Sequence, residues 1–185
     1  MGTVIGMRHG GDVTIAGDRR VSVDGSVRSN DHRHVVEVRG IGIGITGRPG
    51  DIRSFRDRLD EQLRTYEHRG AGTVRATVLE QLLGNLADRF DVACLAVAPD
   101  NDGTPRLLRC GEDGGCTDEP MASIGSGAAV AIGQLEAIDS DTVDPTTLVD
   151  LLGAVAERDA GTNDRIDLWS ASSGLTTADN EGKTD

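Results

Sequence analysis

The sequence predicts one α+β domain, and the order of its periodic segments is the main evidence. Strand-like segments come first, followed by two amphipathic helical segments, more strands, two more helical segments and a last strand. Glycine-rich turns separate these segments. The 185 residues suit a single compact domain with its own core. Two sheets packed face to face, with helices outside both, would satisfy this order.

The first twenty residues predict a β-hairpin. Residues 2–8 and 13–20 alternate apolar and polar positions on either side of a His9-Gly10-Gly11 turn, and the second strand ends on Asp18. Three more short strands are expected beyond it, with a polar loop over 24–33 between the first and the second: residues 21–23, 35–38 and 41–45. In the last of these, isoleucine alternates with glycine, which predicts that another part of the chain packs closely against the glycines.

Two helices are expected next, because apolar residues recur at three- and four-residue spacing over 51–67 and over 73–89. Pro49 suits the first turn of the earlier helix. The remaining elements, in chain order, are strands at 91–98, 105–110, 116–117 and 121–124, helices from Gly127 to Glu136 and from Pro145 to Arg158, and a last strand at 165–171. We expect the domain to span residues 1–178, followed by a mobile polar tail at 179–185.

The charge balance is strongly acidic. Asp and Glu outnumber Lys and Arg by 31 to 19, and Lys183 is the only lysine. Near 1 M salt the Debye length falls to about 3 Å, so a dense acidic surface becomes tolerable, and we interpret the chain as adapted to a salt-rich cytoplasm. A nucleic-acid partner is not expected, because its binding face would need clustered cations. The sequence has no pattern typical of a secretory signal or a membrane span.

The three cysteines have no spacing typical of a zinc site, and no metal or cofactor is expected. Cys110 and Cys116 flank a predicted turn and could face each other across it. For a cytoplasmic protein, we nevertheless predict that these two and Cys94 are reduced.

The opening hairpin, with Gly6 and the Ala16-Gly17-Asp18 segment, resembles that of the N-terminal nucleophile hydrolases of the proteasome β type and their bacterial ring-forming peptidase relatives. The resemblance extends from Gly2 to about Ala171. It implies a four-layer αββα sandwich and a threonine-type endopeptidase. In that chemistry the hydroxyl of an N-terminal threonine attacks the peptide bond, and its own α-amine acts as the base.

Aligned with that family, this chain has Gly2 where the nucleophilic threonine stands, so the hydroxyl is missing. His34 replaces the family's buried lysine, and with an ordinary pKa near 6.5 it would be charged only part of the time at neutral pH. The resemblance implies a carboxylate partner at Asp18, an oxyanion-binding backbone N–H at Gly47, supporting groups at Ser126, Asp159 and Thr162, and substrate contacts at Val21, Ser22 and Ile45.

Two interpretations of the function stay open. In one, the chain is an active peptidase that uses Thr3 after N-terminal processing, although successive strand residues point to opposite faces, which directs Thr3 away from the site. In the other, which the loss of threonine and lysine favours, the chain is a proteolytically inactive ring scaffold, regulator or ligand-binding module. The resemblance also implies a homo-oligomeric ring, a polypeptide substrate and an ATPase partner.

Overall fold

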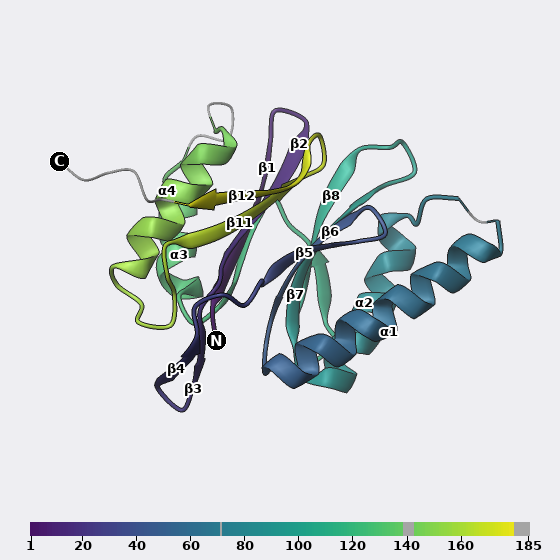
Figure 1. The fold of residues 1–185 in the computed structure, drawn as a ribbon. Coiled ribbons are helices and arrows are strands. Elements are labelled where there is room, and N and C mark those ends of the chain that lie inside the picture. The colour runs from purple at the N-terminus through teal and green to yellow at the C-terminus, as the bar shows by residue number, and fades with distance from the viewer. Residues whose placement is uncertain (71, 139–142, 180–185) are drawn as a thin grey trace.

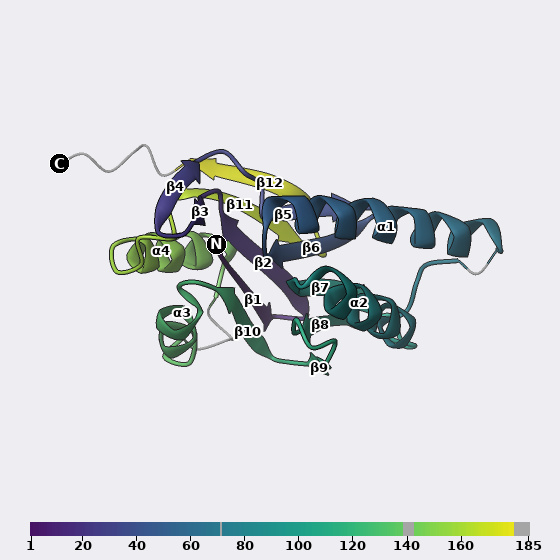
Figure 2. The same ribbon diagram turned by 90° about the horizontal axis from the view of Figure 1, so that it is seen from below.

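Two five-stranded sheets pack face to face, and a pair of helices covers the outer face of each (Figures 1 and 2). The computed structural model describes residues 1–70, 72–138 and 143–179. The four layers are those of the αββα sandwich that the resemblance implies. The predicted fold class is therefore confirmed.

The first sheet contains both ends of the described chain. Its helical cover consists of α3 (Ala128–Leu135) and α4 (Pro145–Ala156). All neighbouring strands in this sheet are antiparallel. In spatial order the strands are β10 (Met121–Gly125), β1 (Thr3–His9), β2 (Asp12–Asp18), β11 (Arg165–Ser170) and β12 (Gly174–Asp179).

The second sheet is covered by the long α1 (Pro49–His68) and by α2 (Ala76–Phe90). Pro49 stands in the first turn of α1, as predicted. The α2 helix begins three residues later than expected because Arg75 is still extended, with φ −90° and ψ 155°. The strands are, in spatial order, β5 (Val35–Val38), β6 (Ile41–Thr46), β7 (Ala93–Pro99), β8 (Pro105–Cys110) and β9 (Cys116–Asp118).

The core between the two sheets depends on glycines of β6. A Cβ atom on Gly42 would overlap the ring of Trp169, and one on Gly44 would overlap Val4. Both neighbours belong to the first sheet. The close approach predicted from the alternating glycines is therefore confirmed, and it brings the two sheets together next to the start of β1.

The polar loop predicted over residues 24–33 is partly wrong. Residues 26–29 form β4 (Ser26–Ser29), which pairs with β3 (Val21–Val23) in a separate two-stranded ribbon. Asp24 and Gly25 make the two-residue turn, with φ of 51° and 74°. An Asp-Gly pair with both φ values positive is a common hairpin turn, and this signal was missed because the following strand is polar and exposed.

The end of the domain also differs from the prediction. The strand at 165–171 is not the last one, because β12 follows it and pairs with β11 as far as Asp179 opposite Arg165. Asp179 thus belongs to the sheet, while the rest of the expected tail, residues 180–185, lies outside the described residues. The β12 segment has one large apolar residue, Leu175, and so lacks the apolar alternation that indicates a strand, and its position at the edge of the sheet explains why few apolar residues are needed.

The prediction of three reduced cysteines is wrong for two of them. Cys110 and Cys116 are paired across β8 and β9, with their Cα atoms 4.1 Å apart, and form a disulfide. Cys94 is a buried free thiol. The five-residue turn places the two strand ends opposite each other, which is the geometry that a cross-strand disulfide needs.

Within the described residues, no helix is both long and apolar enough to span a membrane.

Candidate functional site

The alternation of β1 decides which of its first residues face the space between the sheets. Val4 packs in the core between the sheets, whereas Ile5 and Met7 pack in the core beneath α3 and α4. Gly2 is on the same side as Val4, because the atoms nearest to its missing side chain belong to Asp18 and His34. Thr3 is on the side of Ile5, with its hydroxyl bonded to Thr162.

Asp18, at the end of β2, is fully buried and accepts hydrogen bonds from three backbone N–H groups. Its Oδ1 accepts from Thr3 (2.7 Å), and its Oδ2 accepts from Arg20 and Asn163 (both 2.9 Å). Burial raises the pKa of Asp18 above its usual range, while the charge of His34 and these N–H groups lower it in part. The carboxylate therefore ties the start of β1 to the segments after β2 and α4.

His34 is buried directly before β5 and is fixed by two backbone carbonyl groups. Its Nδ1 lies 2.9 Å from the carbonyl oxygen of Ile45, and its Nε2 lies 3.0 Å from that of Arg20. A carbonyl oxygen only accepts hydrogen bonds, so the doubly protonated ring is the form that satisfies both contacts. In that form His34 carries a positive charge.

The space beside Gly2 is already filled. A Cβ atom on Gly2 would overlap Asp18 Oδ1 and would lie 2.5 Å from Nε2 and 2.6 Å from Cδ2 of His34. Real Cβ atoms essentially never come so close to other heavy atoms. Gly2 and His34 are therefore complementary: the ring stands where a side chain on residue 2 would begin.

Thr3 is fully buried and its hydroxyl belongs to a different network. Thr3 Oγ1 lies 2.7 Å from Thr162 Oγ1 and accepts a hydrogen bond from the backbone N–H of Gly127 (2.8 Å). Neither of these groups belongs to the Asp18 and His34 pair. The hydroxyl thus lies on the face of β1 that the helices cover, as the strand alternation predicts.

Ser126, Asp159 and Thr162 continue this network. Ser126 Oγ donates to Asp159 Oδ2 (2.7 Å) and lies 2.6 Å from the carbonyl oxygen of Met1, and Thr162 Oγ1 donates to the same Asp159 oxygen (2.6 Å). Although partial burial opposes it, the hydrogen bonds from Thr162 and Ser126 hold the pKa of Asp159 below its usual range. The three side chains hold the residues before and after Gly2 without a hydrogen bond to Asp18 or His34.

The remaining residues suggested by the resemblance have different surroundings. Gly47 is buried, and a Cβ atom there would lie 2.8 Å from Val92 Cγ1, so a side chain would be crowded. Val21 is buried and Ser22 half-buried at the base of the β3–β4 ribbon. The side chain of Ile45 packs in the core beneath α1 and α2, while its carbonyl oxygen lies 2.9 Å from His34 Nδ1 and its backbone N–H donates to the carbonyl oxygen of His34 (2.9 Å).

Sequence reasoning missed three residues of the site. His32 stacks edge-on against His34, with ring centroids 4.9 Å apart. Arg20 binds the carbonyl oxygen of Ala160 through its guanidinium group, and Asn163 binds the backbone of Arg19 through its side chain. Arg20 and Asn163 are separated by more than 140 positions in sequence, so only the fold brings them together. The histidine at position 32, two residues from His34, is the one signal that could have been noticed.

Comparison with known proteins identifies the family. Residues 1–170 match the family model described as proteasome subunit. The chain belongs to the proteasome subunit family. It is 29% identical to proteasome subunit beta 2 of Korarchaeum cryptofilum, over 91% of this chain and 90% of that protein. It is 27% identical to proteasome subunit beta 1 of Staphylothermus marinus, over 90% and 83% of the two chains. The fold is thus the α+β fold of the N-terminal nucleophile hydrolases.

In this proteasome-family chain, the candidate site contains Asp18 and His34, and within the described structure the hydroxyls of Thr3, Ser126 and Thr162 bond to neither side chain. Asp18 and His34 lie on either side of the backbone of Gly2, while the hydroxyls of Thr3, Ser126 and Thr162 are bonded to one another, to Asp159 or to the backbone. Among the described residues, no three His, Cys, Asp or Glu side chains are arranged to hold a metal ion.

Proposed function

We propose that this chain is a proteasome β-type subunit that takes part in intracellular protein degradation as an oligomer but does not itself cut peptide bonds by threonine chemistry. Membership of the proteasome subunit family supports the first part. The second part, the absence of threonine-type cleavage, rests on the crowded space beside Gly2. Asp18 and His34 crowd the position at which a nucleophilic side chain would have to stand.

Threonine-type catalysis needs a hydroxyl within reach of the N-terminal amine, its base. Residue 2 has no hydroxyl, and a threonine there could not be accommodated unless the buried ring of His34 moved. A subunit without the nucleophile can still shape a ring and bind a polypeptide, because the scaffold around Gly2 is intact. The hydrogen bonds that Asp18 and Asp159 accept support this statement, because they hold the segments around Gly2 together.

The alternative of an active peptidase that uses Thr3 is less well supported. It would require the removal of two residues, and a rotation or slip of β1 to bring Thr3 Oγ1 to the side of His34. That movement would break the hydrogen bonds from Thr3 to Thr162 and from Gly127 to Thr3. It would also exchange the two faces of β1, so Ile5 would leave the core beneath α3 and α4 and point between the two sheets.

Hydrolysis of fluorogenic peptides by the purified chain tests this proposal, measured in molar salt because we interpret the acidic surface as an adaptation to salt. We expect no hydrolysis above that of a no-protein blank, and no difference between the chain and its Thr3→Ala variant. Hydrolysis that disappears in Thr3→Ala would show instead that Thr3 is the nucleophile.

Assembly is part of the same proposal. The relatives are named as proteasome subunits, and a homo-oligomeric ring in the cytoplasm, with an ATPase as its partner, is the arrangement that we infer for this chain. Light scattering in molar salt measures the mass in solution. A multimer supports the proposal, whereas a monomer at all protein concentrations would contradict it.

A further inference from the structure

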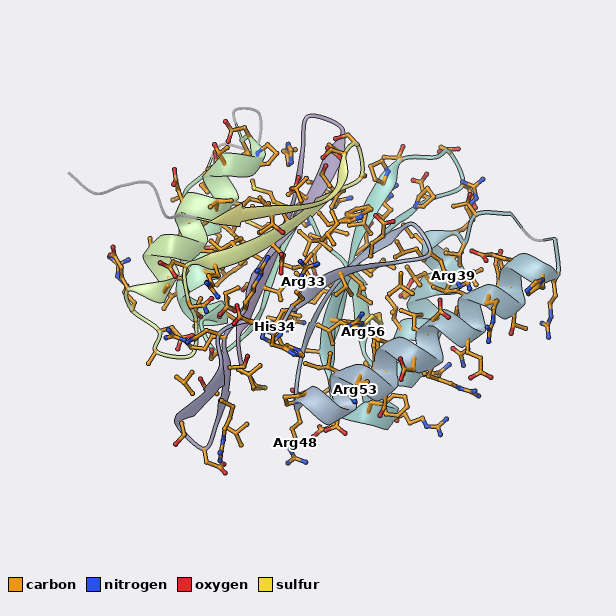
Figure 3. All side chains as sticks on the ribbon, viewed as in Figure 1. Arg33, His34, Arg39, Arg48, Arg53 and Arg56 are labelled. Atoms are coloured by element: carbon orange, nitrogen blue, oxygen red, sulfur yellow. A yellow bond between two sulfur atoms is a disulfide. The ribbon has the colours of Figure 1, made fainter. Side chains whose placement is uncertain are left out.

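One side of α1 has arginines in its N-terminal half and carboxylates in its C-terminal half. Arg53, Arg56, Asp60 and Glu67 follow one another at spacings of three, four and seven residues and therefore share one side of the helix. In the C-terminal half, Asp60 and Glu67 are both paired with Arg39, at 2.8 and 2.5 Å. In the N-terminal half, the two arginines have no such partner. Figure 3 shows Arg53 and Arg56 near the N-terminal end of α1, away from Arg39.

Among the described residues, three arginines at this end of α1 and one in the segment before β5 take part in no ion pair. Within the parts of the chain that the structure describes, Arg33, Arg48, Arg53 and Arg56 form no ion pair and no hydrogen bond with a carboxylate. The chain has 31 acidic residues against 19 basic ones, so carboxylates are plentiful. Unpaired arginines are therefore unexpected at a place where two elements, α1 and the segment before β5, meet.

His32 connects this arginine group to the candidate site. Its ring lies edge-on to that of His34, with the centroids 4.9 Å apart, and its pKa is lowered by burial and, to a smaller extent, by the charges of His34 and Arg56. Two atoms here are buried without a hydrogen-bond partner: Nε2 of His32 and Nε of Arg56. A buried polar atom without a partner is costly, so a ligand that accepts hydrogen bonds from this cluster would be favoured.

The nearest carboxylates in the sequence do not neutralise the cluster. Asp31 is paired with Arg165. Asp57 directly follows Arg56 and so projects about 100° around the helix from it. Asp51, in the first turn of α1, makes no ion pair in the described structure.

We propose that His32, Arg33, Arg53 and Arg56 form a binding site for the carboxylate side chains of an acidic polypeptide segment. The inference rests on the proposed function, in which a polypeptide reaches the region around Gly2, and it specifies which polypeptides are bound. Guanidinium groups bind carboxylates through two parallel hydrogen bonds. The cations come from two separate elements, and alternate side chains of an extended peptide are roughly 6.5 Å apart, so several carboxylates of one segment can be bound together.

Fluorescence anisotropy with two labelled octapeptides tests this site. One peptide alternates Glu with Ser, and the other alternates Gln with Ser. We expect the Glu peptide to bind at least tenfold more tightly than the Gln peptide. The Arg53→Gln/Arg56→Gln double variant should reduce binding of the Glu peptide about tenfold or more, since two charge-assisted hydrogen-bonding groups are lost.

Arg64→Gln/Arg69→Gln is the matched control, because it removes the same charge from exposed residues near the other end of α1. The control should bind the Glu peptide as the unmodified chain does. Equal weakening in both double variants would overturn the inference, because the effect would then come from overall charge. Displacement of the Glu peptide by an equal concentration of inorganic phosphate would also overturn it, since the ligand would be a free anion.

The experiments distinguish failure of the carboxylate-binding site from failure of the proposed function. If the chain binds Glu and Gln peptides equally well, only the carboxylate site is wrong. If fluorogenic peptides are hydrolysed and Thr3→Ala abolishes the hydrolysis, the inactive subunit is wrong, while binding of the Glu peptide stands on its own.

Discussion

The ring of His34 occupies the space in which a side chain on Gly2 would begin, with Nε2 only 2.5 Å from the position of a Cβ atom. Both residues are buried, and the ring is held by carbonyl groups on two different elements. The packing of Gly2 and that of His34 therefore depend on each other. The imidazole ring fits because residue 2 has no side chain.

The first prediction concerns Gly2 itself. Gly2→Ala should lower the free energy of unfolding by about 1–3 kcal/mol, the usual effect of adding a methyl group to a filled core. Denaturant unfolding measures this change. Gly50→Ala is the control, because nothing lies within 4 Å of a Cβ atom there and the residue is in the first turn of α1. Equal stability of Gly2→Ala and the unmodified chain would contradict the crowded site.

The second prediction is that Gly2 and His34 are coupled. In a His34→Ala background, Gly2→Ala should cost less than in the unmodified chain, because the ring no longer crowds the new methyl group. A double-mutant cycle should give a coupling energy on the order of 1–2 kcal/mol. The penalty should not vanish, since Asp18 Oδ1 remains beside residue 2. Strict additivity of the two changes would mean that His34 does not limit the space at Gly2.

The third prediction is that the Thr3 hydroxyl has a structural role. Thr3→Val keeps the shape but leaves the buried N–H of Gly127 without its acceptor and removes the hydrogen bond between the hydroxyls of Thr3 and Thr162. The free energy of unfolding should fall by about 1–3 kcal/mol. Thr3→Ser retains the hydroxyl and should lose less. If the valine variant were as stable as the unmodified chain, the hydroxyl would have to lie outside this network.

The fourth prediction is a dependence of stability on pH through His32. Burial, together with the charges of His34 and Arg56, lowers the pKa of His32 to about 4 from its ordinary 6.5. The unfolded chain therefore takes up this proton first, so stability present above about pH 6.5 is lost as the pH falls towards 4. His32→Gln should lose less stability over this range than the unmodified chain. Parallel unfolding curves against pH for the two proteins would contradict the assignment.

The fifth prediction concerns the cysteines. Iodoacetamide should not label the native, unreduced chain, because Cys110 and Cys116 are joined and burial raises the pKa of the Cys94 thiol to about 12. After unfolding without reductant, mass spectrometry should find one label, on Cys94. Three labels under those conditions would mean that the disulfide is absent. Removing the disulfide with Cys116→Ser should cost roughly 2 kcal/mol, given the short loop that it closes.

The order of helices and strands and the two faces of β1 could be predicted because both depend on local periodicity, whereas the four-layer arrangement was expected only from the family resemblance. The side on which Thr3 lies follows from the period of two in a strand, and the structure agrees. The polar strands β4 and β12 were missed because they are short and lack an apolar pattern. In the case of β4, the Asp24-Gly25 turn was a usable signal that was not applied.

The fit between Gly2 and His34 could not be predicted, since it depends on how three segments meet. The family resemblance implies a missing hydroxyl at Gly2 and a replaced lysine at His34, but nothing in the sequence links the two positions. Only the positions of the Arg20 and Ile45 carbonyl groups turn the ring of His34 towards Gly2. The sequence likewise does not show which arginines near His32 take part in no ion pair among the described residues, because that depends on the packing of α1 against β5.

Reaction with a peptide epoxyketone, followed by mass spectrometry of the intact chain and of its N-terminal fragment, tests the central claim most directly. Such a reagent is captured by a threonine hydroxyl together with the α-amine of the same residue. Because residue 2 lacks the hydroxyl and that of Thr3 is bonded on the opposite face of β1, we predict no adduct in molar salt. An adduct on Thr3, with residues 1 and 2 removed, would contradict this account.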